Sequence, residues 1–121
     1  MPEGTSILIV DDSASFRQTL SLILKCKGYS VVTAGTGEEA IEAVARNSFC
    51  VTFMDVRMPR MNGLETFRRI REIRPKAVVM MMTAYAVEDL VQAALREGAC
   101  GVLYKPLDIE KVLALIERAK R

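Results

Sequence analysis

The sequence has no histidine, no tryptophan and only three cysteines among its 121 residues. Without histidine, the chain cannot form a Ser-His-Asp triad, a His-ligated metal site or a phosphohistidine of its own. Cys26, Cys50 and Cys100 lie far apart with no Cys-x-x-Cys pair, so we expect buried reduced thiols instead of a zinc cluster or disulfide framework. The longest stretch without a charged side chain, residues 77–87, has 11 residues, whereas a transmembrane helix needs roughly 20.

Charge and composition favour one cytoplasmic domain. The first residues, Met-Pro-Glu-Gly, lack the basic start and apolar run of a signal peptide. Half of the residues are apolar, and no linker or repeat divides the chain, so residues 1–121 are predicted to form a single domain. The net charge is only +2. Residues 57–76 carry seven basic side chains against two acidic ones, which we interpret as a solvated helix face, and we expect no direct contact with nucleic acid.

Short apolar runs alternate with helical patterns from one end of the chain to the other. The expected strands are residues 6–10, 30–34, 50–54, 77–82 and 101–104. Between them, Ser13 and Thr36 are candidate N-caps, with Glu39 completing a capping box, and Asp108 opens the last helix. Five strands that are apolar throughout and separated by helices predict a parallel sheet covered on both faces, a doubly wound three-layer α/β sandwich.

Several polar side chains follow the expected strands directly. Asp11 and Asp12 follow the first strand, Asp55 the third, Thr83 the fourth and Lys105 the fifth. Ligands of open α/β sheets bind beyond the carboxyl ends of the strands, so these groups are expected to meet at one edge. Each residue alone has an ordinary explanation, such as a helix cap or a surface charge. Three clustered carboxylates, however, repel one another and require a cation or a proton to relieve the repulsion. If the relief comes from a metal ion, all-oxygen ligands favour Mg²⁺ or Mn²⁺.

These motifs resemble the receiver domains of two-component response regulators. The resemblance rests on Asp11-Asp12, on Asp55 within MDVRMPRMNGLE, on Thr83-Ala84, and on Lys105-Pro106 within GACGVLYKP. It extends from the first strand to the last helix. It implies a flavodoxin-like fold with strand order 2-1-3-4-5, in which the Lys105-Pro106 bond is cis.

The resemblance also implies a function. Asp55 would accept a phosphoryl group from a phosphohistidine on a partner histidine kinase or phosphotransfer protein. Asp12, Asp55 and the backbone carbonyl of Arg57 would bind Mg²⁺, with Asp11 assisting through a water, and Lys105 would contact the phosphoryl oxygens.

The Thr83 hydroxyl would move toward the phosphoryl group and change the surface of the fourth helix, last strand and last helix. A downstream protein or output domain would read that change. The chain would thus be a signalling module that promotes its own phosphorylation and slow dephosphorylation, and not an enzyme in the ordinary sense.

One departure from the family pattern bears on signalling, and two further positions bear on the lifetime of the phosphorylated form. The family usually has an aromatic residue three positions before the lysine, where this chain has Val102. Tyr104 shares a strand face with Val102, so we expect it to carry part of the signalling surface, the alternative being a tyrosine that only packs. Arg57 and Tyr85 flank the expected route of an attacking water. Their bulk is predicted to slow dephosphorylation, unless they are surface side chains without kinetic effect.

Two other functions fit parts of the sequence. Residues 35–40 read Gly-x-Gly-x-x-Ala after a strand, as in a dinucleotide site, but Glu38 and Glu39 would repel a pyrophosphate at that helix N-terminus. An aspartyl phosphohydrolase resembling haloacid dehalogenases would need a second Asp two residues after Asp55, where this chain has Arg57. A stand-alone receiver and a receiver segment of a longer regulator both remain compatible with the sequence.

Overall fold

Five strands and five helices alternate along residues 5–84 and 87–120, the part of the chain that the computed structural model describes. The strands are β1 (Ser6–Val10), β2 (Ser30–Ala34), β3 (Val51–Asp55), β4 (Val79–Thr83) and β5 (Gly101–Tyr104). The helices are α1 (Ala14–Cys26), α2 (Gly37–Arg46), α3 (Gly63–Ile73), α4 (Glu88–Arg96) and α5 (Ile109–Ala119). Within these ranges, no helix combines the length and apolar character needed to cross a membrane.

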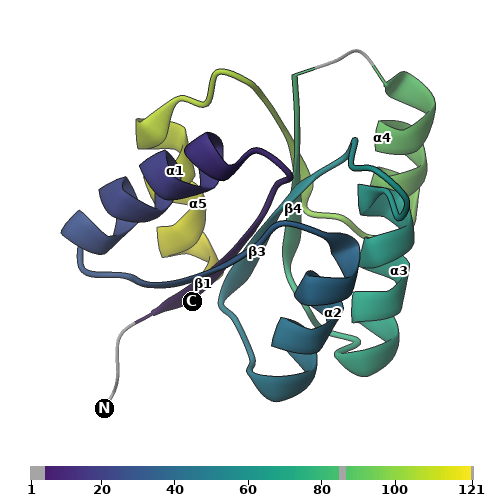
Figure 1. The fold of residues 1–121 in the computed structure, drawn as a ribbon, viewed down its shortest axis with the longest axis horizontal. Coiled ribbons are helices and arrows are strands. Elements are labelled where there is room, and N and C mark those ends of the chain that lie inside the picture. The colour runs from purple at the N-terminus through teal and green to yellow at the C-terminus, as the bar shows by residue number, and fades with distance from the viewer. Residues whose placement is uncertain (1–4, 85–86, 121) are drawn as a thin grey trace.

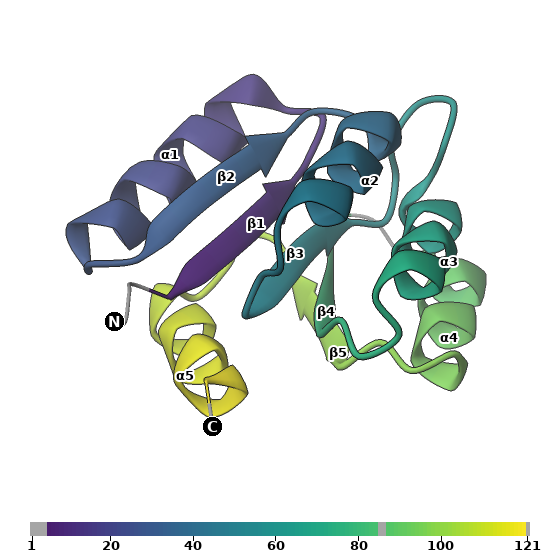
Figure 2. The same cartoon turned by 90° about the horizontal axis from the view of Figure 1, so that it is seen from below.

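All five strands are parallel and lie in the order β2-β1-β3-β4-β5, which confirms the predicted fold class. Helices α1 and α5 cover one face of the sheet, and α2, α3 and α4 cover the other (Figure 1). Figure 2 shows β2 and β5 at the two ends of the strand order. Right-handed crossovers between parallel strands place helices on both faces in this way.

Successive side chains of the central strands point alternately into two separate hydrophobic cores. One core lies under α1 and α5 and takes Ile7, Ile9, Phe53, Met80 and Met82. The other lies under α2, α3 and α4 and takes Leu8, Val10, Met54 and Met81. Strands β3 and β4 are buried along their whole length, so most of their residues are apolar on both faces of the sheet and do not alternate with exposed polar ones.

Two strands are displaced from their predicted positions. Strand β3 covers Val51–Asp55 instead of 50–54, and β4 covers Val79–Thr83 instead of 77–82. Asp55 is opposite Met82 in the sheet, and the next residue, Val56, donates its N–H to the Met82 carbonyl. A run of apolar residues shows which part of the chain is buried, but a strand is defined by its backbone hydrogen bonds to the neighbouring strand. In β3 this pairing continues to Asp55. The candidate site residues Asp55 and Thr83 are therefore the last residues of strands and not the first residues of loops.

The capping interactions differ in part from the prediction. Thr36 caps α2 by accepting from the Glu39 N–H at 3.1 Å, but the Glu39 carboxylate accepts from Gly35 at 2.7 Å and not from Thr36. The reciprocal capping box is found instead at α3. There Asn62 accepts from the Glu65 N–H at 2.9 Å, and Glu65 accepts from the Asn62 N–H at 3.0 Å.

The cysteines are less buried than predicted. Cys26 and Cys100 are exposed and Cys50 is half-buried, and all three are free thiols. Cys26 is the last residue of α1, and Cys100 immediately precedes β5. Both lie at ends of elements, where the apolar face of the element no longer meets the core. The prediction of reduced thiols therefore agrees with the structure, and the prediction of their burial was wrong.

Candidate functional site

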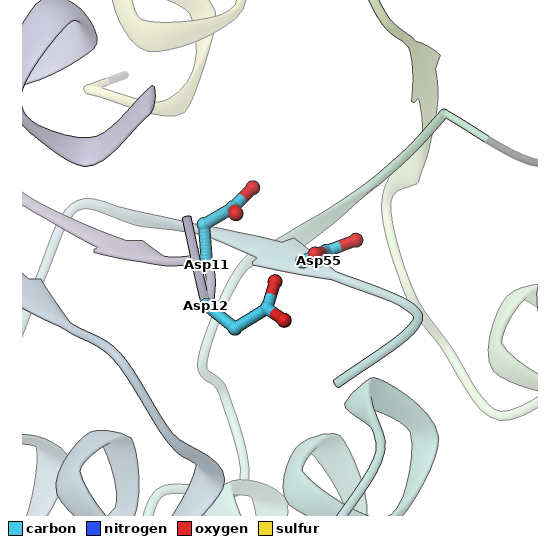
Figure 3. Close-up of side chains that lie close together, drawn as sticks. All are labelled: Asp11, Asp12 and Asp55. Atoms are coloured by element: carbon cyan, nitrogen blue, oxygen red, sulfur yellow. The ribbon is translucent and has the colours of Figure 1, made fainter. Parts of the chain in front are cut away.

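Three carboxylates meet at the carboxyl ends of β1 and β3. Asp11 and Asp12 directly follow β1, and Asp55 ends β3, the neighbouring strand. One oxygen from each of the three lies within 4.8 Å of the others (Figure 3). Asp11 and Asp55 are buried, with 1% and 5% of their surface exposed, whereas Asp12 is exposed. The sheet topology thus brings together acids that are far apart in the sequence.

The loop between β1 and α1 fixes the position of Asp11. Its carboxylate accepts from the Ser13 N–H at 2.9 Å, and the Ser13 hydroxyl in turn accepts from the Phe16 N–H at 3.3 Å as the N-cap of α1. The Arg17 guanidinium donates to the Asp11 carbonyl at 2.7 Å. The first turn of α1 therefore holds both the side chain and the backbone of this acid.

Helix α3 packs closely behind Asp55. A side chain at Gly63 would overlap the Asp55 carbonyl oxygen and would lie 2.9 Å from the Val56 Cα atom. Gly63 also donates its N–H to the Val56 carbonyl at 2.9 Å. An Asn-Gly pair is typical of turns, but here Asn62 caps α3 and Gly63 begins it, which allows the helix to approach the backbone of the candidate phosphoacceptor closely.

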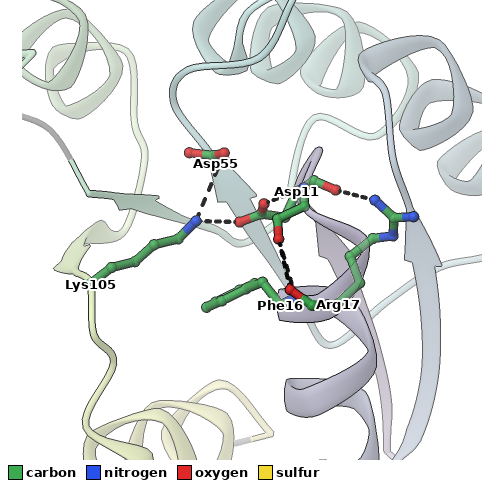
Figure 4. Close-up of polar contacts among 7 residues, drawn as sticks. Asp11, Phe16, Arg17, Asp55 and Lys105 are labelled. Carbon is green, nitrogen blue, oxygen red and sulfur yellow. Dashed lines mark hydrogen bonds and ion pairs between the residues drawn. The ribbon is translucent and has the colours of Figure 1, made fainter.

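Among the described residues, Lys105 is the one that contributes an ammonium group to this cluster. Its Nζ atom lies 2.5 Å from an Asp11 oxygen and 3.9 Å from an Asp55 oxygen (Figure 4). The lysine side chain is 17% exposed. It follows β5 directly, and the Lys105-Pro106 peptide bond is cis. The ammonium also lies 4.2 Å from the centre of the Phe16 ring.

The pKa of Asp55 is raised to about 7, well above that of an ordinary aspartate. Burial is the largest cause, and the negative charge of Asp11 adds to it. Lys105 and a hydrogen bond from the Arg57 backbone oppose the rise without cancelling it. Three carboxylates and one ammonium leave two negative charges in the cluster when all are ionised. The all-oxygen donor set and the uncompensated charge fit a hard divalent cation.

A cavity of about 640 Å³ opens onto the acids and Lys105. Arg57 lines it, which agrees with its predicted place near the site. Met58, Asn62 and Leu90 also line this cavity, and the sequence pattern did not predict them as site residues. Asn62 has a recognisable signal, since Asn-x-x-Glu before an apolar helix marks a capping box, whereas nothing in the spacing singles out Leu90.

Thr83, Val102 and Tyr104 do not line the cavity with the acids. Thr83 ends β4 fully buried, and Tyr104 is its partner residue on β5. Val102 is half-buried against the core under α2, α3 and α4, while Tyr104 is 54% exposed. Tyr85, the other predicted kinetic residue, lies outside the described residues.

The dinucleotide-like segment serves helix packing. Glu38 and Glu39 lie in the first turn of α2, where their charges oppose a phosphate. A side chain at Gly37 would overlap the Thr66 hydroxyl and lie 2.9 Å from the Met61 sulfur. Gly37 is thus required for the contact between α2 and α3. This packing explains the second glycine of the Gly-x-Gly-x-x-Ala segment without a bound nucleotide.

A doubly wound sheet in the order 2-1-3-4-5, with three acids and a lysine at its carboxyl edge, defines a CheY-like α/β domain. The family model described as "Response regulator receiver domain" matches residues 7–117. The chain therefore belongs to the receiver domains of two-component response regulators, as the resemblance in its motifs implies. Members of this family are signalling domains.

Relatives and solved structures agree with this family. The transcriptional regulatory protein ZraR of Escherichia coli is 37% identical over 117 residues, which cover 97% of this chain but only 26% of ZraR. The CheY of Borrelia burgdorferi, solved with CheX, BeF3 and Mg, is 32% identical with a TM-score of 0.86, covering 97% of this chain and 90% of that one. A response regulator of Burkholderia pseudomallei, solved with a phosphorylated aspartic acid, a calcium ion and citrate, is 27% identical with a TM-score of 0.85, covering 96% and 69%.

Proposed function

We propose that Asp55 is the phosphoacceptor of this receiver domain and takes its phosphoryl group from a phosphohistidine on a partner histidine kinase or phosphotransfer protein. The observation that supports this assignment is the place of Asp55, at a cavity that also presents two acids and the ammonium of Lys105. The phosphorylated aspartic acid of the Burkholderia pseudomallei structure is consistent with it. Residues 1–121 contain no histidine, so the donor phosphohistidine lies outside them.

The chemistry is a phosphoryl transfer between two nucleophiles. A carboxylate oxygen of Asp55 attacks the phosphorus, the bond between phosphorus and the donor histidine nitrogen breaks, and an acyl phosphate forms. The released imidazole keeps the electron pair of that bond and takes up a proton. Lys105 is positioned to donate to a phosphoryl oxygen, since its ammonium already lies 3.9 Å from Asp55.

We propose Mg²⁺ as the cation of this site, with Mn²⁺ as a substitute. Both Asp11 oxygens already accept, one from Ser13 and one from Lys105, which favours Asp12 and Asp55 as the direct protein ligands. The backbone carbonyl of Arg57 would complete the set. When bound, the ion would offset the charge of the acids and of the incoming phosphoryl group.

Phosphorylation would change the surface formed by α4, β5 and α5. The Thr83 hydroxyl, at the end of β4, would bond to a phosphoryl oxygen and bring the segment before α4 with it. A downstream protein or an output domain would then bind the changed surface. The chain spans about a quarter of the length of ZraR, so that relative has further residues in which an output domain could lie.

Intact-mass measurement after incubation with Mg²⁺ and acetyl phosphate tests this function. We expect a gain of one phosphoryl group that disappears in Asp55→Asn and in the presence of a chelator. Asp108→Asn is a matched control, because asparagine also caps a helix and Asp108 caps α5 away from the acids. A phosphoryl gain that persists in Asp55→Asn would assign the phosphoacceptor to another residue.

Tyr104→Ala should weaken binding of the downstream partner to the phosphorylated form by about tenfold, because an exposed tyrosine offers a large apolar contact at an interface. Titration calorimetry with the phosphorylated domain measures the change, and Leu22→Ala, which removes an exposed apolar side chain from α1, is the comparison. Equal affinities for wild type and Tyr104→Ala would assign Tyr104 a packing role only.

Arg57→Ala should shorten the lifetime of the phosphorylated form by about threefold, because the Arg57 side chain borders the cavity through which water reaches Asp55. Tyr85→Ala combined with it is expected to shorten the lifetime further. The decay is followed by intact mass after removal of the phosphodonor. An unchanged or longer lifetime in both variants would contradict the shielding role.

A further inference from the structure

We propose that Phe16 is a positioning residue for phosphoryl transfer: its ring keeps the Lys105 ammonium at the acidic site when a divalent cation occupies the carboxylates. This inference rests on the proposed phosphoacceptor function of Asp55. It concerns a contact between the first helix and the loop that follows the last strand, two parts of the chain that the fold brings together.

The Lys105 ammonium has three neighbours of different character. Its Nζ atom lies 2.5 Å from an Asp11 oxygen, 3.9 Å from an Asp55 oxygen and 4.2 Å from the centre of the Phe16 ring. In Figure 4 the ring lies on the side of the ammonium away from Asp55. A distance of 4.2 Å is well within the range at which a cation is attracted to the face of an aromatic ring.

The position of Phe16 is fixed by the same hydrogen bonds that position Asp11. The Phe16 N–H donates to the Ser13 hydroxyl, and the Ser13 N–H donates to the Asp11 carboxylate. The ring is half-buried and packs against the core under α1 and α5. The ring and the carboxylate therefore face Lys105 as parts of one rigid turn.

The two attractions respond differently to a bound cation. The pull of Asp11 and Asp55 on the ammonium is that of opposite charges, and a divalent ion bound among the carboxylates offsets it and adds repulsion. The attraction of the Phe16 ring comes from its quadrupole, which a bound ion does not neutralise. A bound ion therefore weakens the net pull of the carboxylates on Lys105 but leaves the attraction of the Phe16 ring unchanged, so the ring contributes a larger share of the attraction in the metal-loaded site.

Beyond these three neighbours, the described surroundings of the Lys105 ammonium on the side of α1 and α5 are mainly apolar. Lys105 borders both the acidic cavity and an apolar groove of about 580 Å³. The groove is lined mainly by Phe16, Leu20, Ile23, Pro106, Leu107 and Ile109. Apolar side chains cannot replace the hydrogen bonds of an ammonium, so a lysine released by the acids would turn toward solvent. Retention by Phe16 keeps it within reach of a phosphoryl group on Asp55.

The direct test is the NMR shift of the Lys105 ε-methylene protons in protein labelled with ¹³C-lysine. A proton over an aromatic ring resonates upfield, and we expect this shift in wild type with a chelator and also with saturating Mg²⁺. In Phe16→Leu the upfield shift should be lost, and Mg²⁺ should move the resonance to that of a solvent-exposed lysine. Loss of the upfield shift when Mg²⁺ is added to wild type would overturn the proposal.

The second arm measures phosphorylation by acetyl phosphate, which needs no docking partner. In Phe16→Leu the maximal rate constant should fall about fivefold, and Phe16→Tyr should restore it. Phe49→Leu changes another half-buried phenylalanine, in the opposite core, and should leave the rate unchanged. In a Lys105→Met background, Phe16→Leu should cause no further loss.

The outcomes separate this inference from the proposed function. An unchanged rate in Phe16→Leu, an equal loss in Phe49→Leu, or a further loss in the Lys105→Met background would overturn the role of Phe16. Failure of wild type to be phosphorylated would overturn the function of Asp55, and the NMR result would then still show whether the ring holds the ammonium.

Discussion

Asp55→Asn should make the metal-free protein more stable at pH 8, raising its free energy of unfolding by about 2 kcal/mol. Burial and the charge of Asp11 raise the pKa of Asp55 to about 7, so the ionised carboxylate is held unfavourably in the folded state. Asparagine has nearly the same shape and no charge. The full shift would correspond to about 4 kcal/mol, which solvent in the open cavity reduces.

The pH dependence follows from the sign of the shift. The folded protein binds the Asp55 proton more tightly than the unfolded chain, in which the pKa is near 3.8. The Asp55 contribution to wild-type stability should therefore fall as pH rises from about 4 to about 7, and level off above that range. The two proteins should differ little at pH 4 and most at pH 8.

Urea unfolding in a chelator across this pH range measures the difference, with Asp108→Asn as a control. Addition of Mg²⁺ should stabilise wild type more than Asp55→Asn, because the ion relieves the same repulsion that the substitution removes. A wild-type protein more stable than Asp55→Asn at pH 8 in the chelator would contradict the electrostatic description of the site.

Lys105→Met should have two opposite effects, destabilising the metal-free protein and tightening Mg²⁺ binding. Asp11 is 1% exposed, and its partner ammonium lies 2.5 Å away. Removing that ammonium leaves a buried carboxylate without its cation, which should cost about 2–3 kcal/mol of stability. Methionine retains most of the apolar length of lysine, so lost packing contributes little.

The gain in Mg²⁺ affinity has the same origin. Lys105 and a bound ion are both positive and both attracted by Asp11 and Asp55. Without the lysine, we expect the dissociation constant for Mg²⁺ to fall about tenfold, and saturating Mg²⁺ to restore much of the lost stability. Calorimetric titration and urea unfolding measure the two effects, with Lys111→Met on exposed α5 surface as the control. Weaker Mg²⁺ binding in Lys105→Met would contradict this competition.

Much of the fold could be predicted because its signals are local. Alternation of apolar runs with helical spacing predicted the five strands and five helices, and parallel strands necessarily carry residues such as Asp11 and Asp55 to one edge of the sheet. The ends of β3 and β4 were displaced because apolar character reports burial, and both residues that end these strands, Asp55 and Thr83, are polar.

The contacts that the sequence could not predict depend on how separate elements are oriented. The ring of Phe16 meets Lys105 only because α1 lies against the loop before α5, and spacing within α1 says nothing of that loop. Gly63 is required by its approach to the Asp55 backbone, yet Asn-Gly alone also fits an ordinary turn. Leu90 reaches the cavity from α4, whose placement depends on packing against α3.

The ion pair between Asp11 and Lys105 joins residues 94 positions apart, so it also has a consequence for synthesis on the ribosome. The three acids are translated long before Lys105, and a nascent chain that ends ahead of it carries their mutual repulsion without its internal counter-charge. Because Lys105 follows the last strand, β5, chains released before it would lack this charge and would be less stable and more easily degraded than complete ones. The counter-charge of the acids is thus among the last parts of this domain to be synthesised.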